Sequence, residues 1–210
     1  MKRLFGNTTI LMGVVLMLGL SAHASTVSVT FGGAPTGVND GADYVLPYQL
    51  NINGILTDAT CYDIFDNVTG GESWTANALT LNQAAATGQF SGSGDSLSSY
   101  KEVGFLSLQT TNSPQDQIDL QHDIWNVFAA GTYTVTTGMQ HYLDLLATPA
   151  YANFDFGRVL FLEDVNGTGR AQAFVIDPPT ASPEPGTIML MGAGALLIGI
   201  GRIRRQKRLK

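Results

Sequence analysis

Two apolar segments, one near each end of the chain, limit the part of the sequence that can form a folded domain. The first covers residues 10–20 and the second residues 187–201. Both have the charged flanks that are typical of targeting or membrane segments, so neither is expected to join a water-soluble core. The region between them has roughly 150 residues, the usual size of one domain with its own hydrophobic core.

The N-terminal segment has the three parts of a secretory signal peptide. Lys2 and Arg3 form a basic start, residues 10–20 form the apolar centre, and Ala22-His23-Ala24 is a small-residue cleavage pattern. We expect residues 1–24 to be removed and the exported chain to begin at Ser25.

The C-terminal segment is short for a membrane span. As a helix, residues 187–201 would extend about 23 Å at ~1.5 Å per residue, against a hydrocarbon core of about 30 Å. The basic residues that follow can reach cytoplasmic headgroups; they are Arg202, Arg204, Arg205, Lys207, Arg208 and Lys210. Because positive residues stay inside, we expect everything before Pro183 to lie outside the cytoplasm, held for a time at the inner membrane.

The tripeptide Pro183-Glu184-Pro185 stands just before this apolar run and its basic tail. In this order, the three features resemble the PEP-CTERM sorting signal of exported Gram-negative bacterial proteins. The resemblance covers residues 183–210, and residues 178–182 form an extended linker before them. It implies recognition by exosortase, a membrane-embedded cysteine transpeptidase, and a destination at the cell surface or in the exopolysaccharide matrix. The alternative is a single-pass anchor that no enzyme cuts.

The region between the two terminal segments is strongly acidic. Its only basic residues are Lys101, Arg158 and Arg170, whereas all 17 acidic residues of the chain lie between Asp40 and Glu184. Three positive charges against 17 negative ones leave −14. This charge favours solubility and argues against nucleic acid as a partner, since phosphates need cationic contacts. No motif implies a cofactor.

Apolar–polar alternation and short apolar runs between turn residues predict strands over most of the domain. The expected strands are residues 25–31, 48–53, 61–65, 73–81, 132–136, 158–162 and 171–176. The last two flank Asn166-Gly167, a dipeptide typical of hairpin turns.

Three helices are expected in the middle of the chain, at residues 97–108, about 114–130 and 140–147. The second has Ser113 as N-cap and Pro114 at its first position, and the third should stop at Pro149. We therefore predict an α+β fold for residues 25–177. It should be mainly antiparallel β, sandwich or barrel-like, with a helical insertion at about 97–147.

Gln121 is the most informative residue of the second predicted helix. At about 100° per residue it falls near the middle of an apolar arc. The arc is formed by Ile118, Leu120, Ile124, Trp125, Val127 and Phe128. A carboxamide buried there costs about 1–3 kcal/mol unless it is hydrogen bonded. Either backbone or water partners or covalent chemistry would account for it.

Cys61 is the only cysteine, so the chain has no intramolecular disulfide. Cys61 after an upstream strand, together with the apolar-Gln-x-x-apolar-Trp pattern at residues 120–125, resembles the thioester domains of Gram-positive surface adhesins. The resemblance implies that Cys61 supplies sulfur and Gln121 the acyl group of an internal thioester that traps surface amines, with Trp125 shielding the bond. A buried, inert Cys61 and a reactive free thiol are the alternatives.

Metal sites are weakly indicated. Residues 163–169 loosely resemble a calcium loop, but a plain hairpin is the simpler interpretation. Asp63, Asp66 and Glu72 could chelate, although a solvated acidic loop is the default. The histidine pattern at His122 and His141-x-x-Asp144 does not have zinc-site spacing. We expect Asp119 and Asp123, one helical turn apart, to form the solvent-exposed face of the second helix.

Enzyme motifs are absent from the sequence, although two distant carboxylates of a glycoside hydrolase would leave no signature. The sequence therefore favours an exported adhesive or structural protein over an enzyme. The alternatives are a non-covalent carbohydrate-binding matrix protein and, third, a secreted hydrolase.

Overall fold

The computed structural model describes residues 24–92, 94–109, 111, 113–167 and 171–178. The predicted sorting signal and all of the predicted signal peptide except Ala24 lie outside these residues. Among the helices that are described, none is long and apolar enough to cross a bilayer.

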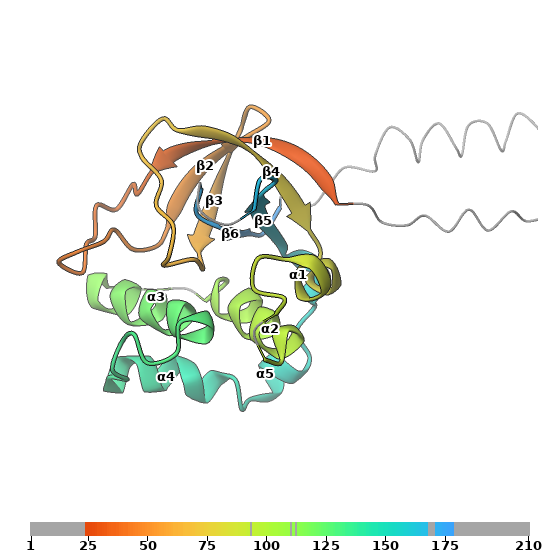
Figure 1. The fold of residues 1–210 in the computed structure, drawn as a ribbon. Coiled ribbons are helices and arrows are strands. Elements are labelled where there is room, and N and C mark those ends of the chain that lie inside the picture. The colour runs from red at the N-terminus through yellow and green to blue at the C-terminus, as the bar shows by residue number, and fades with distance from the viewer. Residues whose placement is uncertain (1–23, 93, 110, 112, 168–170, 179–210) are drawn as a thin grey trace, which may run out of the picture.

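Six antiparallel strands form a closed barrel in the order β1-β2-β3-β6-β5-β4 (Figure 1). The strands are β1 Ser25–Gly33, β2 Tyr48–Ile52, β3 Ile55–Cys61, β4 Ser73–Leu79, β5 Leu160–Asp164 and β6 Phe174–Ile176. The predicted α+β class with a mainly antiparallel sheet is thus confirmed, and the sheet is a barrel. The predicted pairing of the last two strands as a hairpin is also confirmed.

The predicted strand at residues 61–65 is wrong, because the strand lies immediately before it and ends at Cys61. Asn53 and Gly54 both have positive φ, at 50° and 90°, and form the tight turn that pairs β2 with β3. Ile55 and Leu56 are 58% and 61% exposed, so the start of this strand lacks the alternation that would have identified it.

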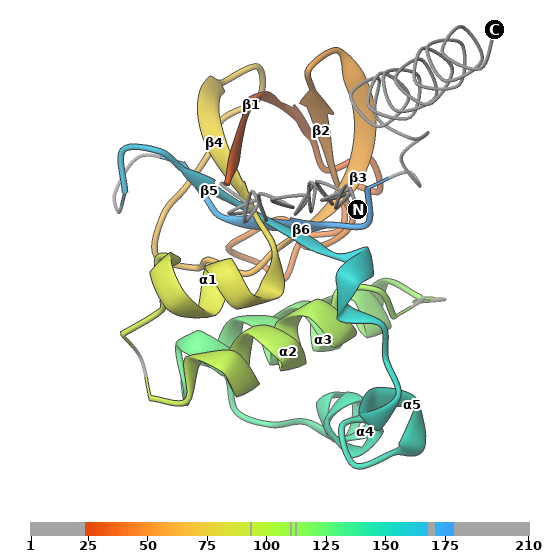
Figure 2. The same ribbon diagram turned by 90° about the vertical axis from the view of Figure 1, so that its right-hand side faces the viewer.

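The helices of the described residues all lie at one end of the barrel, and α4 and α5 are farthest from it (Figures 1 and 2). Their bounds are α1 Leu81–Thr87, α2 Ser96–Leu106, α3 Pro114–Phe128, α4 Thr137–Leu145 and α5 Pro149–Ala152, and a 3-10 turn follows at Phe156–Arg158. The three expected helices correspond to α2, α3 and α4. Helix α1, which begins with a Thr80–Gln83 capping box, was not predicted, and Pro149 starts α5 rather than only ending α4.

Residues 132–136 do not form the expected strand. The side chain of Asn126 donates to the backbone carbonyl of Tyr133 at 2.8 Å and accepts from its backbone N–H at 3.0 Å. A side chain of α3 therefore replaces the neighbouring strand that this segment would need.

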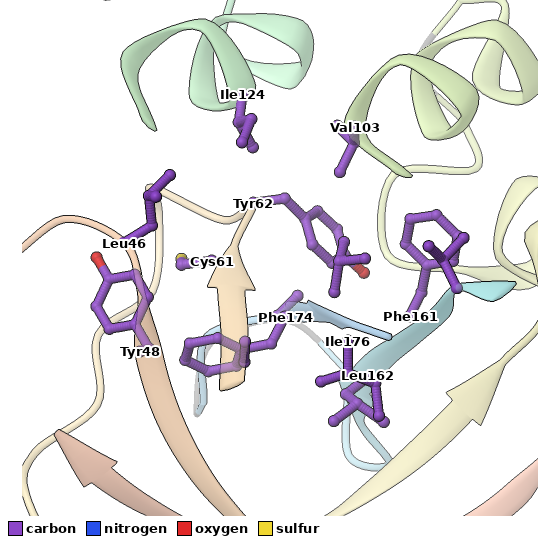
Figure 3. Close-up of a cluster of buried hydrophobic side chains, with 14 of the residues drawn as sticks. Leu46, Tyr48, Cys61, Tyr62, Val103, Ile124, Phe161, Leu162, Phe174 and Ile176 are labelled. Carbon is purple, nitrogen blue, oxygen red and sulfur yellow. The ribbon is translucent and has the colours of Figure 1, made fainter. Parts of the chain in front are cut away.

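The core continues from the barrel interior into the layer under the helices. Figure 3 shows Cys61 at the tip of β3 between Tyr48 and Tyr62, with Ile124 of α3 pointing toward this cluster. All four side chains are at most 3% exposed. The end of β3 and the inner face of α3 therefore meet in a layer from which water is excluded.

Candidate functional site

The side-chain amide of Gln121 is fully buried and joins two other parts of the chain. Its Nε2 donates to the backbone carbonyl of Cys61 at 2.7 Å, and its Oε1 accepts from the backbone N–H of Leu46 at 3.2 Å. The burial predicted from the helical arc is confirmed. Backbone partners offset the cost of placing the carboxamide in an apolar layer.

Cys61 is the last residue of β3, and its thiol is fully buried. The thiol donates to the backbone carbonyl of Asp63 at 3.0 Å. Burial raises the pKa of the Cys61 thiol to about 12, although the side chain of Trp125 acts to lower it. A buried thiol with a raised pKa does not behave as a reactive surface thiol, which weakens that alternative.

The fold thus brings Cys61 and Gln121 together across 60 positions of sequence. Both side chains are fully buried between the barrel and α3, and the amide of Gln121 contacts the backbone of Cys61. The strand ends where the chain must leave the barrel, and α3 lies directly across that end (Figure 1). Two residues with the functional groups of a thioester are therefore neighbours.

Trp125 lies one turn after Gln121 on α3, next to Cys61. Its side chain is 1% exposed. The indole N–H is close enough to the Cys61 thiol to affect its pKa, yet Trp125 Nε1 makes no hydrogen bond of standard geometry within the described part of the chain. The indole of Trp125 therefore contacts this buried layer chiefly through its apolar ring.

A stack of rings lies outside Trp125. The ring centroids of His122 and Tyr133 are 3.6 Å apart and the two rings are nearly parallel. Both centroids lie within 6.0 Å of the centroid of the Trp125 ring. His122 Nε2 is 2.7 Å from Asp40 Oδ2, in the loop between β1 and β2. Partial burial acts to raise the pKa of Asp40, but the N–H groups of Asp43 and Ala42 and the His122 ring outweigh it and hold the pKa below its usual range. This carboxylate anchors the loop over the site.

Sequence reasoning missed a second buried polar network, next to the first. Glu163 Oε1 accepts from the hydroxyls of Tyr62 at 2.6 Å and Tyr100 at 2.9 Å, and Glu163 Oε2 accepts from the backbone of Gln89 at 2.6 Å. The Gln89 side chain donates to Asp63 at 2.9 Å. The buried Tyr-Asp pair after Cys61 was the available signal, but the partners come from distant elements. The tyrosine hydroxyls and the Gln89 amide already donate to carboxylates of this network. The network therefore connects the helices to the barrel and is structural.

The expectation that Asp119 and Asp123 form an exposed helix face is wrong. They are 5% and 1% exposed, because α4 packs on the outer face of α3. Asp119 accepts from the Thr136 hydroxyl at 2.8 Å, whereas neither carboxylate oxygen of Asp123 has a hydrogen-bond partner within the described residues. Desolvation, with the Asp119 charge second, raises the pKa of Asp123 to about 7.

The residues considered for metal binding are separated or occupied. Among the residues that the structure describes, no three His, Cys, Asp or Glu side chains form a group that could hold a metal ion. Glu163, in the expected calcium-like loop, is bonded to tyrosines, and the end of that loop lies outside the described residues. Glu72 accepts from Thr69 at 2.9 Å, and Asp144 from Gln140 at 2.8 Å.

No protein-family model, no curated protein and no solved structure matches this chain.

Proposed function

We propose that this chain is an exported protein of the cell surface or extracellular matrix that captures amines through an internal thioester between Cys61 and Gln121. The export signals predicted from the sequence support a location outside the cytoplasm, where exosortase would act at Pro183-Glu184-Pro185. One observation carries the chemical part of the proposal. Gln121 Nε2 is 2.7 Å from the backbone carbonyl of Cys61, and both side chains are sealed from water.

The proposed bond forms by condensation of the two side chains. The Cys61 sulfur attacks the carboxamide carbon of Gln121, the C–N bond breaks, and the thiol proton leaves with the amide nitrogen as ammonia. The thiol must first release the carbonyl of Asp63, its hydrogen-bond acceptor. The backbone N–H of Leu46 already points at Gln121 Oε1 and would stabilise the negative charge that develops on that oxygen.

The dry surroundings suit such a bond, because exclusion of water protects an acyl group from hydrolysis. Trp125 covers the site. The His122–Asp40 contact holds the ring of His122, which stacks on Trp125, against the loop between β1 and β2. Two backbone hydrogen bonds would also satisfy a glutamine with a purely structural role. The experiment must therefore distinguish the thioester from an inert, buried Cys61.

Intact mass spectrometry of the mature protein tests the proposal. The full chain is expressed with its signal peptide in a secreting host, and the exported product is weighed before and after denaturation in an alkylating agent. A thioester lowers the mass by one ammonia and blocks alkylation of Cys61. Gln121→Ala serves as the control with a free thiol. A wild-type protein of full mass with an alkylated Cys61 would rule the thioester out.

The sorting part of the proposal has a separate test. In a host that contains exosortase, the exported protein should lack the residues after the Pro183-Glu184-Pro185 motif, and Glu184→Ala should keep them. A wild-type chain that retains its basic tail in the mature envelope would identify residues 187–210 as an ordinary anchor.

One cavity, beside β3, is roomy enough to be considered for non-covalent carbohydrate binding. It has a volume of about 570 Å³ and is lined by polar residues such as Asp58, Gln109 and Asp177 and by apolar ones such as Leu56 and Val175. No aromatic ring is among its described lining residues. Since it lacks the flat apolar platform on which a sugar ring would pack, we place the covalent proposal first.

A further inference from the structure

A small cavity has Trp125 among its lining residues. Its volume is about 90 Å³, which equals roughly three water molecules at ~30 Å³ each. Its lining residues in the described part of the chain are four aromatic residues, one carboxylate, two carboxamides and a valine: Phe31, Tyr44, Tyr48, Trp125, Asp43, Asn67, Gln172 and Val68. Its size suits the end of one alkyl chain rather than a folded ligand.

This cavity adjoins the candidate thioester. Trp125 is common to both, since it lines the cavity and lies over Cys61. Gln172 donates to the carbonyl of Asp63 at 3.3 Å, the same oxygen that accepts the Cys61 thiol at 3.0 Å. The charge of Asp43 also acts on the thiol. A molecule in the cavity is therefore one ring away from the proposed bond.

The lining suits a small organic cation. Asp43 is half-buried, and within the described part of the chain no donor is hydrogen bonded to its carboxylate. Tyr44 is 58% exposed at the rim, and aromatic faces attract cations through their quadrupoles. No lysine or arginine lines the cavity among the residues described. The net negative charge of the exported region attracts cations from solution as well.

We infer that this cavity, defined here as the Asp43 cavity, binds the end of a primary alkylammonium and presents it to the Cys61–Gln121 thioester. For its chemistry the inference rests on the proposed thioester; for its binding step it does not. Asp43 holds the ammonium, the rings of Tyr44 and Trp125 contact the alkyl chain, and displacement of the Trp125 ring opens the way inward. The ligand class is a lysine-like side chain or a free alkylamine.

The transfer step balances without a further reactant. The bound ammonium gives one proton to solvent, and the free amine nitrogen attacks the carbonyl carbon of Gln121. The carbon–sulfur bond breaks, Cys61 leaves as a thiolate, and it takes the second amine proton. The products are an amide between Gln121 and the amine and a free Cys61 thiol.

The binding step can be tested without the thioester. In a Cys61→Ala variant of the mature protein, titration with n-butylammonium should change the fluorescence of Trp125, and n-butanol of the same shape should not. Asp43→Asn should weaken butylammonium binding about tenfold. Asp58→Asn, in the cavity of about 570 Å³ beside β3, is the matched control and should change nothing. Equal responses to the cation and the alcohol, or loss of binding in Asp58→Asn instead, would overturn the inference.

The transfer step is tested in the protein with Cys61 intact. Asp43→Asn and Tyr44→Ala should slow release of the Cys61 thiol by n-butylamine but leave release by uncharged hydroxylamine unchanged. Rates that fall equally for both nucleophiles, or for neither, would contradict a cation-selecting role. If the wild-type protein has full mass, the thioester fails, while butylammonium binding by Cys61→Ala still decides whether the cavity is a cation site.

Discussion

Gln121 Nε2 donates to the backbone carbonyl of Cys61 at 2.7 Å, so a helix and a strand that are 60 residues apart meet through one side chain. The contact has two consequences. It holds α3 against the end of β3 in the absence of any covalent bond, and it places the carboxamide of Gln121 at the backbone of the residue that carries the thiol. The first consequence is structural and the second chemical, and different variants separate them.

Gln121→Ala should destabilise the fold even where no thioester can form. In a Cys61→Ala background, the change leaves the backbone carbonyl of position 61 and the N–H of Leu46 buried without their partner, at about 1–3 kcal/mol for each group. Denaturant unfolding measures the loss. Gln117→Ala, one turn earlier, is the control, because the buried Oε1 of Gln117 has no partner among the described residues. An equal loss of unfolding free energy in the two variants would mean that the Gln121 hydrogen bonds do not contribute to stability.

Trp125→Ala should shorten the lifetime of the thioester. Removal of the indole admits water to the buried Cys61–Gln121 pair. Hydrolysis of the proposed thioester should then accelerate on the order of tenfold, because exclusion of water protects the acyl group. The readout is the rate at which the intact mass gains one water at neutral pH. Trp125→Phe keeps a ring over the site and should be intermediate. An unchanged rate in Trp125→Ala would remove Trp125 as the shield.

The Asp40–His122 contact should make stability depend on acid. The fold lowers the pKa of Asp40, chiefly through backbone N–H groups and His122 acting against partial burial, so the native state favours the ionised form. The resulting stability is present above the unfolded pKa of about 3.9 and is lost as pH falls through the lower, folded pKa. Melting temperatures from pH 5 downward measure it. In Asp40→Asn this part of the pH dependence should disappear; an identical acid profile would refute the assignment.

Asp123→Asn should stabilise the protein at neutral pH. Desolvation and Asp119 raise the pKa of Asp123 to about 7, so the native state holds its proton more tightly than the unfolded state does. The contribution of Asp123 to the free energy of unfolding is therefore most favourable below the unfolded pKa of about 3.9. It declines as pH rises toward the folded pKa of about 7 and is constant above that pH. Asp123→Asn removes the buried charge and should flatten this slope in melts between pH 4 and 8. Asp144→Asn, at an exposed position of α4, should keep the slope.

Gly138→Ala should destabilise the contact between α3 and α4 despite the better helix propensity of alanine. A Cβ at Gly138 would lie 2.0 Å from Asp119 Oδ2, so α4 or the carboxylate must move. We expect a net loss of about 1–2 kcal/mol, measured by denaturant unfolding, since overpacking costs more than the ~1 kcal/mol gained in propensity. The double variant Asp119→Ala/Gly138→Ala removes the clash, and its loss should be smaller than the sum of the single losses. Strict additivity would show that the two residues do not interact.

Local patterns were sufficient for several parts of this molecule. Ser113 and Pro114 define the start of α3, Asn166-Gly167 predicts the last hairpin, and the apolar arc of α3 predicts that Gln121 is buried. Each depends on residues within a few positions of one another, where capping, turn geometry and helical periodicity act directly. The acidic balance and the export signals are likewise properties of the chain itself, and the signals stay predictions.

Other features depend on partners that are distant in sequence, and only the tertiary structure decided them. Asp123 has the spacing of an exposed face, but α4 covers it, and residues 132–136 have a strand pattern, but Asn126 takes the place of a strand partner. The proximity of Cys61 and Gln121 belongs to this second group. Short-range patterns report which face of an element is apolar; which element packs on that face, and which polar groups then meet, follows from how the barrel closes and where the helices cover its end.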